Sequence, residues 1–190
     1  NRKKDAKKYD HGSVLIIGGS QIYSGSPAIS GLAALRSGAD IAQIIAPRRS
    51  ADIVAGFSPD LITYPVDGEA LKLDDLTRLF EITQAAKSAA RGNLAVVIGG
   101  GIGRKKETKE LVRRYVKDVS VPVVVDADGI YAFEEKGEEF LHENCLFTPH
   151  LYEFFILTGK KINDFSTDDK KQAVRQAAAE MGITIALKGA

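Results

Sequence analysis

The chain has 190 residues, 44% of them hydrophobic, and its 26 basic and 25 acidic side chains leave a formal net charge of +1. This length and composition suit one α/β domain with a sizeable core, and the near-zero charge gives no overall electrostatic case for binding nucleic acid or a membrane surface. The sequence has neither a signal peptide nor an apolar run near the roughly 20 residues of a membrane helix, so we expect a cytoplasmic protein.

Predicted strands and helices alternate along the N-terminal half of the chain. The strands are apolar runs without polar alternation, typical of strands covered on both faces, and they lie at 13–17, 41–46 and 61–66. The predicted helices span 26–37, 47–57 and 73–90. Pro65 indicates that the third strand lies at an edge of the sheet or stops early.

The first predicted helix has clear boundary signals. We expect Ser26 as its N-cap and Pro27 at the first helical position, and Gly38 should end it. The apolar side chains expected to face the sheet are Ile29, Leu32, Ala33 and Leu35. The helix is also rich in small residues, which permit close packing on a sheet.

The same alternation continues to the C-terminal end. Strands are predicted at 93–98, 121–125, 145–147 and 183–187. Helices are predicted from the glycine turn to about 117, from 150 to 157 and from 166 to 181. This pattern predicts the α/β class with a single domain over 1–190. Because the chain stops directly after a strand, we expect that domain to be incomplete at its C-terminal end.

A glycine cluster follows the strand at 93–98 and precedes a helix. Glycines at 99, 100, 101 and 103 allow positive φ and a close approach to a ligand, and the first amides of the next helix would face an anion. Arg104, Lys105 and Lys106 come next; they would either help to hold phosphate or simply begin a solvated helix.

Five apolar runs end in small or polar residues, and in a parallel sheet these endings share the edge at which ligands bind. One ending carries Asp126 and Asp128, whose carboxylates would hold Mg²⁺, orient a ribose or cap the next helix. Another carries His150, which would contact a ligand or cap its helix. No His/Cys cluster suggests zinc, and we predict no metal site on the chain itself.

Six motifs in order resemble those of the NAD(P)H-hydrate dehydratases, which have a ribokinase-like fold, a three-layer α/β/α sandwich with a mostly parallel central sheet. They are GSVLIIGGS, YSGSPAISGLAALRSGAD, VIGGGIG, VVVDADG, TPHLYEFFILTG and ALKGA. Ser26 stands where the family more often has alanine, and Gly100 replaces the proline of its Gly-Pro-Gly-Leu-Gly turn. The resemblance implies an enzyme that dehydrates NADHX or NADPHX to NAD(P)H while consuming ADP or ATP.

The resemblance also implies site residues. The substrate-binding set expected from the resemblance and from the strand endings is Ser26, Gly101, Gly103, Asp128 and His150; the nucleotide-binding set is Lys188, Gly189 and Ala190. The Gly-Thr-Gly-Asp motif that follows in the family is absent, so its catalytic aspartate would lie beyond Ala190. Mg²⁺ with the nucleotide, an NAD(P)H-hydrate epimerase domain or partner, and a homotetramer are further expectations.

Two alternatives remain open. One is a kinase of the same fold acting on a vitamin precursor such as hydroxymethylpyrimidine, and the other is a non-catalytic nucleotide-binding protein if Ala190 is a true terminus. A Rossmann site is excluded because Arg104 occupies the last glycine position of the G-x-G-x-x-G pattern.

Overall fold

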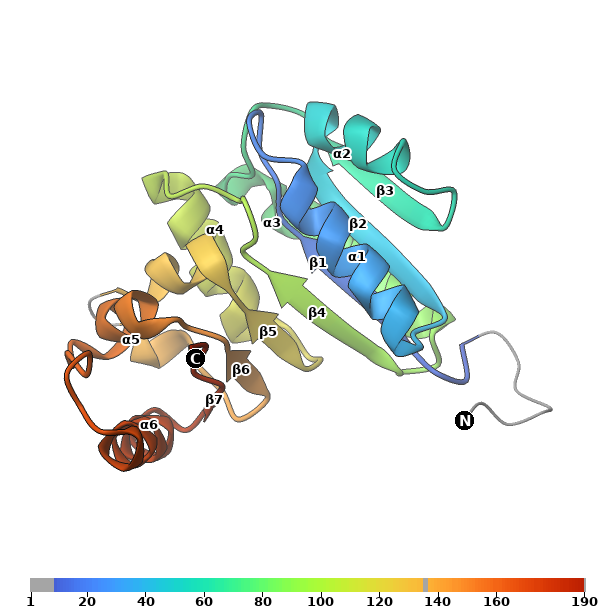
Figure 1. Cartoon of the computed structure of the whole chain (residues 1–190). Helices are drawn as coiled ribbons and strands as arrows, with labels where there is room; N and C mark the ends of the chain where they lie inside the picture. The colour runs from blue at the N-terminus through green and yellow to red at the C-terminus, as the bar shows by residue number, and fades with distance from the viewer. Residues whose placement is uncertain (1–8, 135–136, 190) are drawn as a thin grey trace.

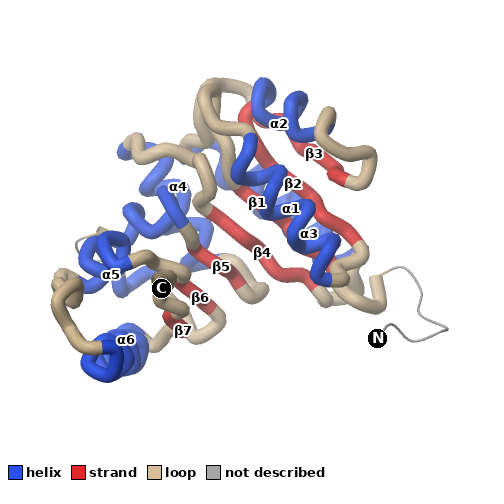
Figure 2. The backbone as a smooth tube through the Cα atoms, viewed as in Figure 1, coloured by secondary structure: helices blue, strands red, loops and turns tan. Residues whose placement is uncertain are grey.

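One seven-stranded parallel sheet organises the molecule (Figures 1 and 2). The computed structural model describes residues 9–134 and 137–189. The strands are β1 Ser13–Ile17, β2 Ile41–Pro47, β3 Leu61–Val66, β4 Leu94–Ile98, β5 Val123–Val125, β6 Cys145–Phe147 and β7 Thr184–Ile185. Their order is β3-β2-β1-β4-β5-β6-β7, and every pair is parallel. The α/β prediction is confirmed, and β3, which contains Pro65, is an edge strand as predicted.

Helices connect successive strands. The α-helices are α1 Gly25–Ser37, α2 Arg48–Ala55, α3 Leu76–Ala89, α4 Lys106–Asp118, α5 Leu151–Thr158 and α6 Thr167–Met181. Three 3₁₀ helices accompany them: η1 Leu73–Asp75, η2 Ala127–Phe133 and η3 Glu138–Phe140. All six predicted helices are present, although the one expected at 73–90 begins as η1, and η2 was not predicted. In the described part of the chain, every helix is too short or too polar to cross a bilayer.

Helices cover the sheet on both faces, and the alternation of side chains along β1 shows which helix covers which face. Leu15 and Ile17 belong to a core that α3 and α4 complete, whereas Ile16 points to the other face and packs with residues of α1 and α2. Successive residues of a strand point to opposite faces, so a fully apolar strand requires a helical layer on each side. A third, smaller cluster joins α5 to α6 around Phe154.

The structure corrects the prediction for α1. Its N-cap is Ser24 rather than Ser26, which lies in the first turn. The helix is rotated so that Pro27, Ala28 and Gly31 are buried, while Ile29 is 70% exposed. Small residues decide this rotation, because a Cβ at Gly31 would come within 2.8 Å of the Leu61 side chain. Close packing of the backbone on the sheet outweighs the burial of one isoleucine.

The strand order reverses direction between β1 and β4. From β1 the chain proceeds outward to β2 and β3, and from β4 it proceeds to the opposite edge through β5 and β6. The connections after β1 and β4 therefore lead to helices on opposite faces, α1 and α4 (Figure 1). In open α/β sheets this arrangement leaves a crevice at the carboxyl ends of the two strands, where ligands bind.

We expect Gly99→Ala to lower the free energy of unfolding by about 3 kcal/mol. Alanine is strained at the positive φ of this position, and its methyl group would also collide with the backbone. Gly99 has φ +127°, and its Cβ would lie 2.0 Å from the Asp126 carbonyl oxygen. Gly38→Ala is the matched control, since Gly38 has φ +111° with no atom within 4 Å of the added carbon. Urea denaturation of both variants measures the difference. Equal losses of unfolding free energy in the two variants would show that the collision with the Asp126 carbonyl adds nothing to the cost of the positive φ.

Candidate functional site

The floor of the crevice is made by backbone packing against backbone. The Gly19 amide donates to the Gly100 carbonyl at 2.9 Å, and a Cβ at Gly18 would lie 2.5 Å from the same oxygen. On the other side of this loop, Gly99 packs against Gly129 at the start of η2. Three strand-end loops thus meet without intervening side chains, and a ligand can approach their amides closely.

Three of the predicted substrate-binding residues surround this floor. A Cβ at Gly100 would lie 2.2 Å from the Ser26 hydroxyl oxygen, so Ser26 faces the glycine loop from the first turn of α1. Gly101 lies against the Tyr23 side chain, whereas the space beside Gly103 is open for 4 Å. The structure therefore brings Ser26, Gly101 and Gly103 to one loop.

Asp128 holds the glycine loop through hydrogen bonds. Its carboxylate accepts a hydrogen bond from the Gly103 amide at 3.2 Å and another from the Arg104 Nε at 2.6 Å. The Arg104 guanidinium also lies 3.5 Å from the centre of the Tyr131 ring, a cation–π contact. Its contacts with the Gly103 amide and with Arg104 are a role that the sequence did not predict.

Asp126 occupies the N-cap position of η2, but its carboxylate binds a lysine from the segment that follows β7. The Lys188 Nζ donates to the Asp126 carboxylate at 2.5 Å and lies 3.6 Å from Glu153. Burial acts to raise the pKa of Asp126, but hydrogen bonds from Lys188 and the Thr148 hydroxyl outweigh it, and the pKa is held below its ordinary value of 3.8. The ends of β5, β6 and β7 are joined by this contact.

His150 is the N-cap of α5. Its Nδ1 accepts from the backbone amides of Tyr152 at 3.1 Å and Glu153 at 3.3 Å, while the Glu153 carboxylate accepts from the His150 amide at 2.8 Å. A ring nitrogen that accepts carries no proton, so a ring hydrogen of His150 lies on Nε2. Nε2 is 3.5 Å from the Glu153 carboxylate, and because the side chain is half exposed, the Nε2–H group can also reach a ligand.

The predicted histidine and lysine lie at the same edge. The Lys188 amide donates to the Pro149 carbonyl at 2.7 Å, next to His150, and both side chains approach the nearly buried Glu153. Gly189 follows with open space beside it, and Ala190 lies outside the described residues. The cap role considered for His150 is present, and it uses Nδ1, while Nε2 lies 3.5 Å from the Glu153 carboxylate on the half-exposed side of the ring.

A cationic hollow of about 460 Å³ opens beside Lys188. Lys170, Lys171 and Arg175 of α6 contribute to its wall, and Leu151 and Val174 supply apolar surface. Sequence reasoning missed these α6 residues, since it predicted the helix at 166–181 without assigning its side chains a role. Their spacing at i, i+1 and i+5 was a weak signal, because charged helix faces are usually solvated.

The carboxylates do not form a ready metal site. Within residues 9–134 and 137–189, no group of three or more His, Cys, Asp or Glu side chains could hold a metal ion. Asp126 and Asp128, for which Mg²⁺ was considered, are each paired with a basic side chain. Any magnesium at this edge would depend mainly on oxygen ligands from a bound phosphate.

We expect Asp126→Asn to lower the free energy of unfolding by about 0.5 kcal/mol at neutral pH, a small effect because the ion pair is partly exposed. The folded pKa of Asp126 is lowered, so its contribution is complete above the ordinary value of 3.8 and is lost as pH falls through the folded pKa. Urea denaturation at pH 7 and near pH 2 measures this change. Asp60→Asn, at an exposed turn, controls for net charge, and a pH-independent difference would contradict the assignment.

Sequence comparisons match nearly the whole chain. The profile of a family described as NAD(P)H-hydrate dehydratase matches residues 14–190. A bifunctional NAD(P)H-hydrate repair enzyme of Pyrobaculum aerophilum is 38% identical, over 99% of this chain and 36% of that protein. An ADP-dependent (S)-NAD(P)H-hydrate dehydratase of Cenarchaeum symbiosum is 35% identical, over 100% of this chain and 63% of that protein. The chain thus spans just over a third of the length of the bifunctional relative.

Solved structures agree on the fold. A ribokinase-like superfamily protein from Enterococcus faecalis superposes with a TM-score of 0.80 at 21% identity, over 100% of this chain and 61% of its own. The ADP/ATP-dependent NAD(P)H-hydrate dehydratase of Bacillus subtilis, co-crystallised with ATP/Mg²⁺, superposes with a TM-score of 0.73 at 21% identity. The match covers 100% of this chain and 62% of that one. The fold is ribokinase-like, and by its sequence the chain belongs to the NAD(P)H-hydrate dehydratase family.

Proposed function

We propose that the protein is a repair lyase that dehydrates the hydrated nicotinamide of NADHX or NADPHX to NAD(P)H at the expense of ADP or ATP. The observation that carries the proposal is that His150 and Lys188 meet through Glu153 beside a glycine-lined crevice. Such an edge offers a hydrogen-bond donor, a cation and close-packed amides within one site. The family membership supports the same chemistry.

The reaction needs two phosphorylated molecules side by side. Transfer of the terminal phosphoryl group of the nucleotide to the hydroxyl of the hydrate releases AMP from ADP, or ADP from ATP, and gives a phosphate ester. The lone pair of the ring nitrogen then expels inorganic phosphate, and loss of a ring proton restores the reduced nicotinamide. Catalysis of this kind depends on positioning and on stabilising negative charge, which amides and cations supply.

The residues divide between the two ligands. The cationic hollow with Lys188 and Gly189 suits the phosphates of the adenine nucleotide, since lysine acts on phosphate as a point charge. The glycine floor with Ser26, and the half-exposed Nε2 of His150, suit the hydrated dinucleotide. Magnesium would enter with the nucleotide, and the family's catalytic aspartate is expected after Ala190.

Other features belong to the same proposal. A homotetramer, a cytoplasmic location and a single domain over 1–190 are inferred from the sequence and the family resemblance. An NAD(P)H-hydrate epimerase, as a domain or a partner, is supported by relatives described as bifunctional repair enzymes. Both ADP and ATP occur as co-substrates in the names of relatives.

We expect the full gene product to restore the absorbance of reduced nicotinamide when NADHX and ADP or ATP are supplied together. Lys188→Ala should raise the KM for the nucleotide about tenfold, because one charge-assisted contact is lost. His150→Ala should raise the KM for NADHX or lower kcat. Steady-state kinetics with each substrate varied in turn measures both effects.

Lys87→Ala is the matched control, because the Lys87 Nζ contacts Ser120, which precedes β5 and lies outside the strand-end edge. It should leave both KM values unchanged. Nucleotide turnover driven by a stable alcohol such as hydroxymethylpyrimidine, without NADHX, would favour a kinase and contradict the proposal. Binding of both nucleotides without turnover would favour a non-catalytic protein.

A further inference from the structure

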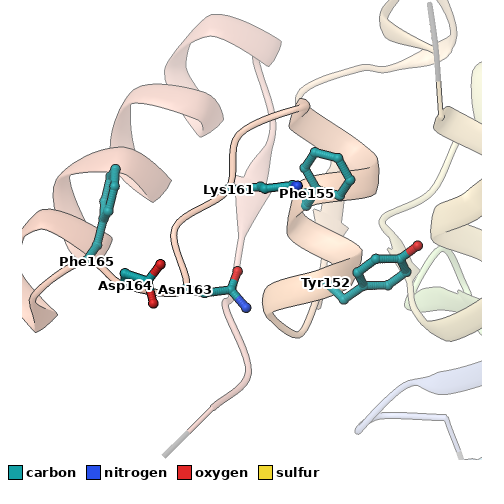
Figure 3. A pocket seen from close by; sticks show the side chains of 6 residues that line it. All are labelled: Tyr152, Phe155, Lys161, Asn163, Asp164 and Phe165. Carbon is teal, nitrogen blue, oxygen red and sulfur yellow. The ribbon is translucent and has the colours of Figure 1, made fainter.

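A second hollow, of about 560 Å³, lies against α5 and within the size range of small-molecule sites. Figure 3 shows the side chains around it: two come from α5, three from the loop that follows, and one from the residue before the N-cap of α6. They are Tyr152, Phe155, Lys161, Asn163, Asp164 and Phe165. We call this hollow the aromatic slot.

Aromatic rings dominate the slot. Tyr152 and Phe155 are one turn apart on α5 with ring centroids 6.1 Å from each other, and Phe165 belongs to a different segment. Tyr152 is 57% exposed and Phe165 is 46% exposed. Flat, solvent-facing rings on two segments offer stacking surfaces, and every nucleic base has a face that can stack on them.

The polar side chains suit the rest of a nucleotide. Lys161 lies with its Nζ 5.2 Å from the centre of the Phe155 ring, so a positive charge is held at the aromatic wall. Asp164 can only accept hydrogen bonds, which favours a base with an amino group over one with a carbonyl at the same position. Asn163 offers both a donor and an acceptor. Adenine carries such an amino group, and it is the base of the proposed substrates NADHX and NADPHX.

The slot lies next to the strand-end site, across the first turn of α5. The Tyr152 amide donates to His150 Nδ1 at 3.1 Å, and Phe155 lies about 7.5 Å from His150 along the helix axis. Leu151, between these residues in sequence, lines the cationic hollow beside Lys188 instead. The first turn of α5 therefore separates two hollows, and His150 is at their junction.

We propose that the aromatic slot binds the adenosine half of the hydrated dinucleotide, with its nicotinamide half at His150 and the glycine floor. The inference rests on the proposed function, which requires a dinucleotide and a separate adenine nucleotide. The cationic hollow receives the phosphates of the co-substrate, and the aromatic slot receives the base of the substrate. The first turn of α5 thus separates the phosphates of the co-substrate from the base of the substrate.

The test uses the fluorescence of bound NADH and of reduced nicotinamide mononucleotide, which lacks the adenosine half. Tyr152→Ala and Phe165→Ala should each raise the Kd for NADH about tenfold and leave the Kd for the mononucleotide unchanged, because only the dinucleotide reaches the slot. Tyr152→Phe should retain the affinity. Phe57→Ala is the matched control, since Phe57 is 56% exposed and follows α2 at the opposite side of the sheet.

Three results separate the two proposals. Unchanged NADH affinity in both alanine variants overturns the slot while leaving the proposed function intact. An equal loss for NADH and the mononucleotide overturns it as well, because the variants would then act through His150. Absence of NADH binding to the unmodified protein would overturn both proposals.

A second measurement tests which base is recognised. Reduced nicotinamide hypoxanthine dinucleotide, in which a carbonyl replaces the adenine amino group, should bind about tenfold more weakly than NADH. Asp164→Asn should abolish this preference, because an amide can turn its donor toward the carbonyl. Calorimetric titration with ADP should show no change in Tyr152→Ala. A loss of ADP affinity with unchanged NADH affinity would assign the slot to the co-substrate and overturn the inference.

Discussion

The site depends on one constraint: backbone packs directly on backbone where the strand order reverses between β1 and β4. Gly18 packs on Gly100, and Gly99 packs on Gly129, so the loops after β1 and β4 and the start of η2 lie at distances that no side chain permits. A Cβ at any of these positions would separate the loops or move them off the strand ends. The same packing that closes the fold here leaves amides, rather than side chains, at the floor of the crevice.

Around this floor, carboxylates hold the basic side chains in place. Lys188 lies between Asp126 and Glu153, and Arg104 lies between Asp128 and the Tyr131 ring. Arg104 and Asp128 join the segments after the neighbouring strands β4 and β5, whereas Lys188 and Asp126 join the segments after β7 and β5, across β6, so the cations are positioned by the fold itself. A phosphate that binds at Lys188 must compete with the carboxylates, and its own higher charge favours that exchange.

Much of this architecture was predictable because the sequence patterns are local. The apolar run at 123–125 and Pro65 in β3 indicated a buried parallel strand and an edge strand, and both are present. The face of α1 was predicted only in part: Leu32 and Leu35 pack on the core as expected, but hydrophobicity favoured Ile29 where the sheet selects Gly31 for its size. Hydrophobic periodicity contains no information on how closely a helix approaches its sheet.

The site was predictable in part for a similar reason. Strand endings indicated which loops would share an edge, and family resemblance named His150 and Lys188. The partners of the acidic residues were not predictable, because the pairing of Asp126 with Lys188 joins residues that are 62 positions apart in the chain. Asn163, Asp164 and Phe165 also lacked a signal, since a polar loop that ends in one aromatic residue resembles any exposed connection.

The parallel sheet has a further consequence, for the order in which the chain can fold. No two adjacent strands are joined by a hairpin, and β1 meets β4 only through the pairing of Ser13 with Leu94 and the residues after them. Such distant pairings are slow to form, because a long loop must close before any contact compensates its lost entropy. Early in folding, β1, β2 and β3 can assemble with α1 and α2 while the crevice does not yet exist. The ligand site is therefore a late product of folding, and on the ribosome it cannot arise before β4 has emerged.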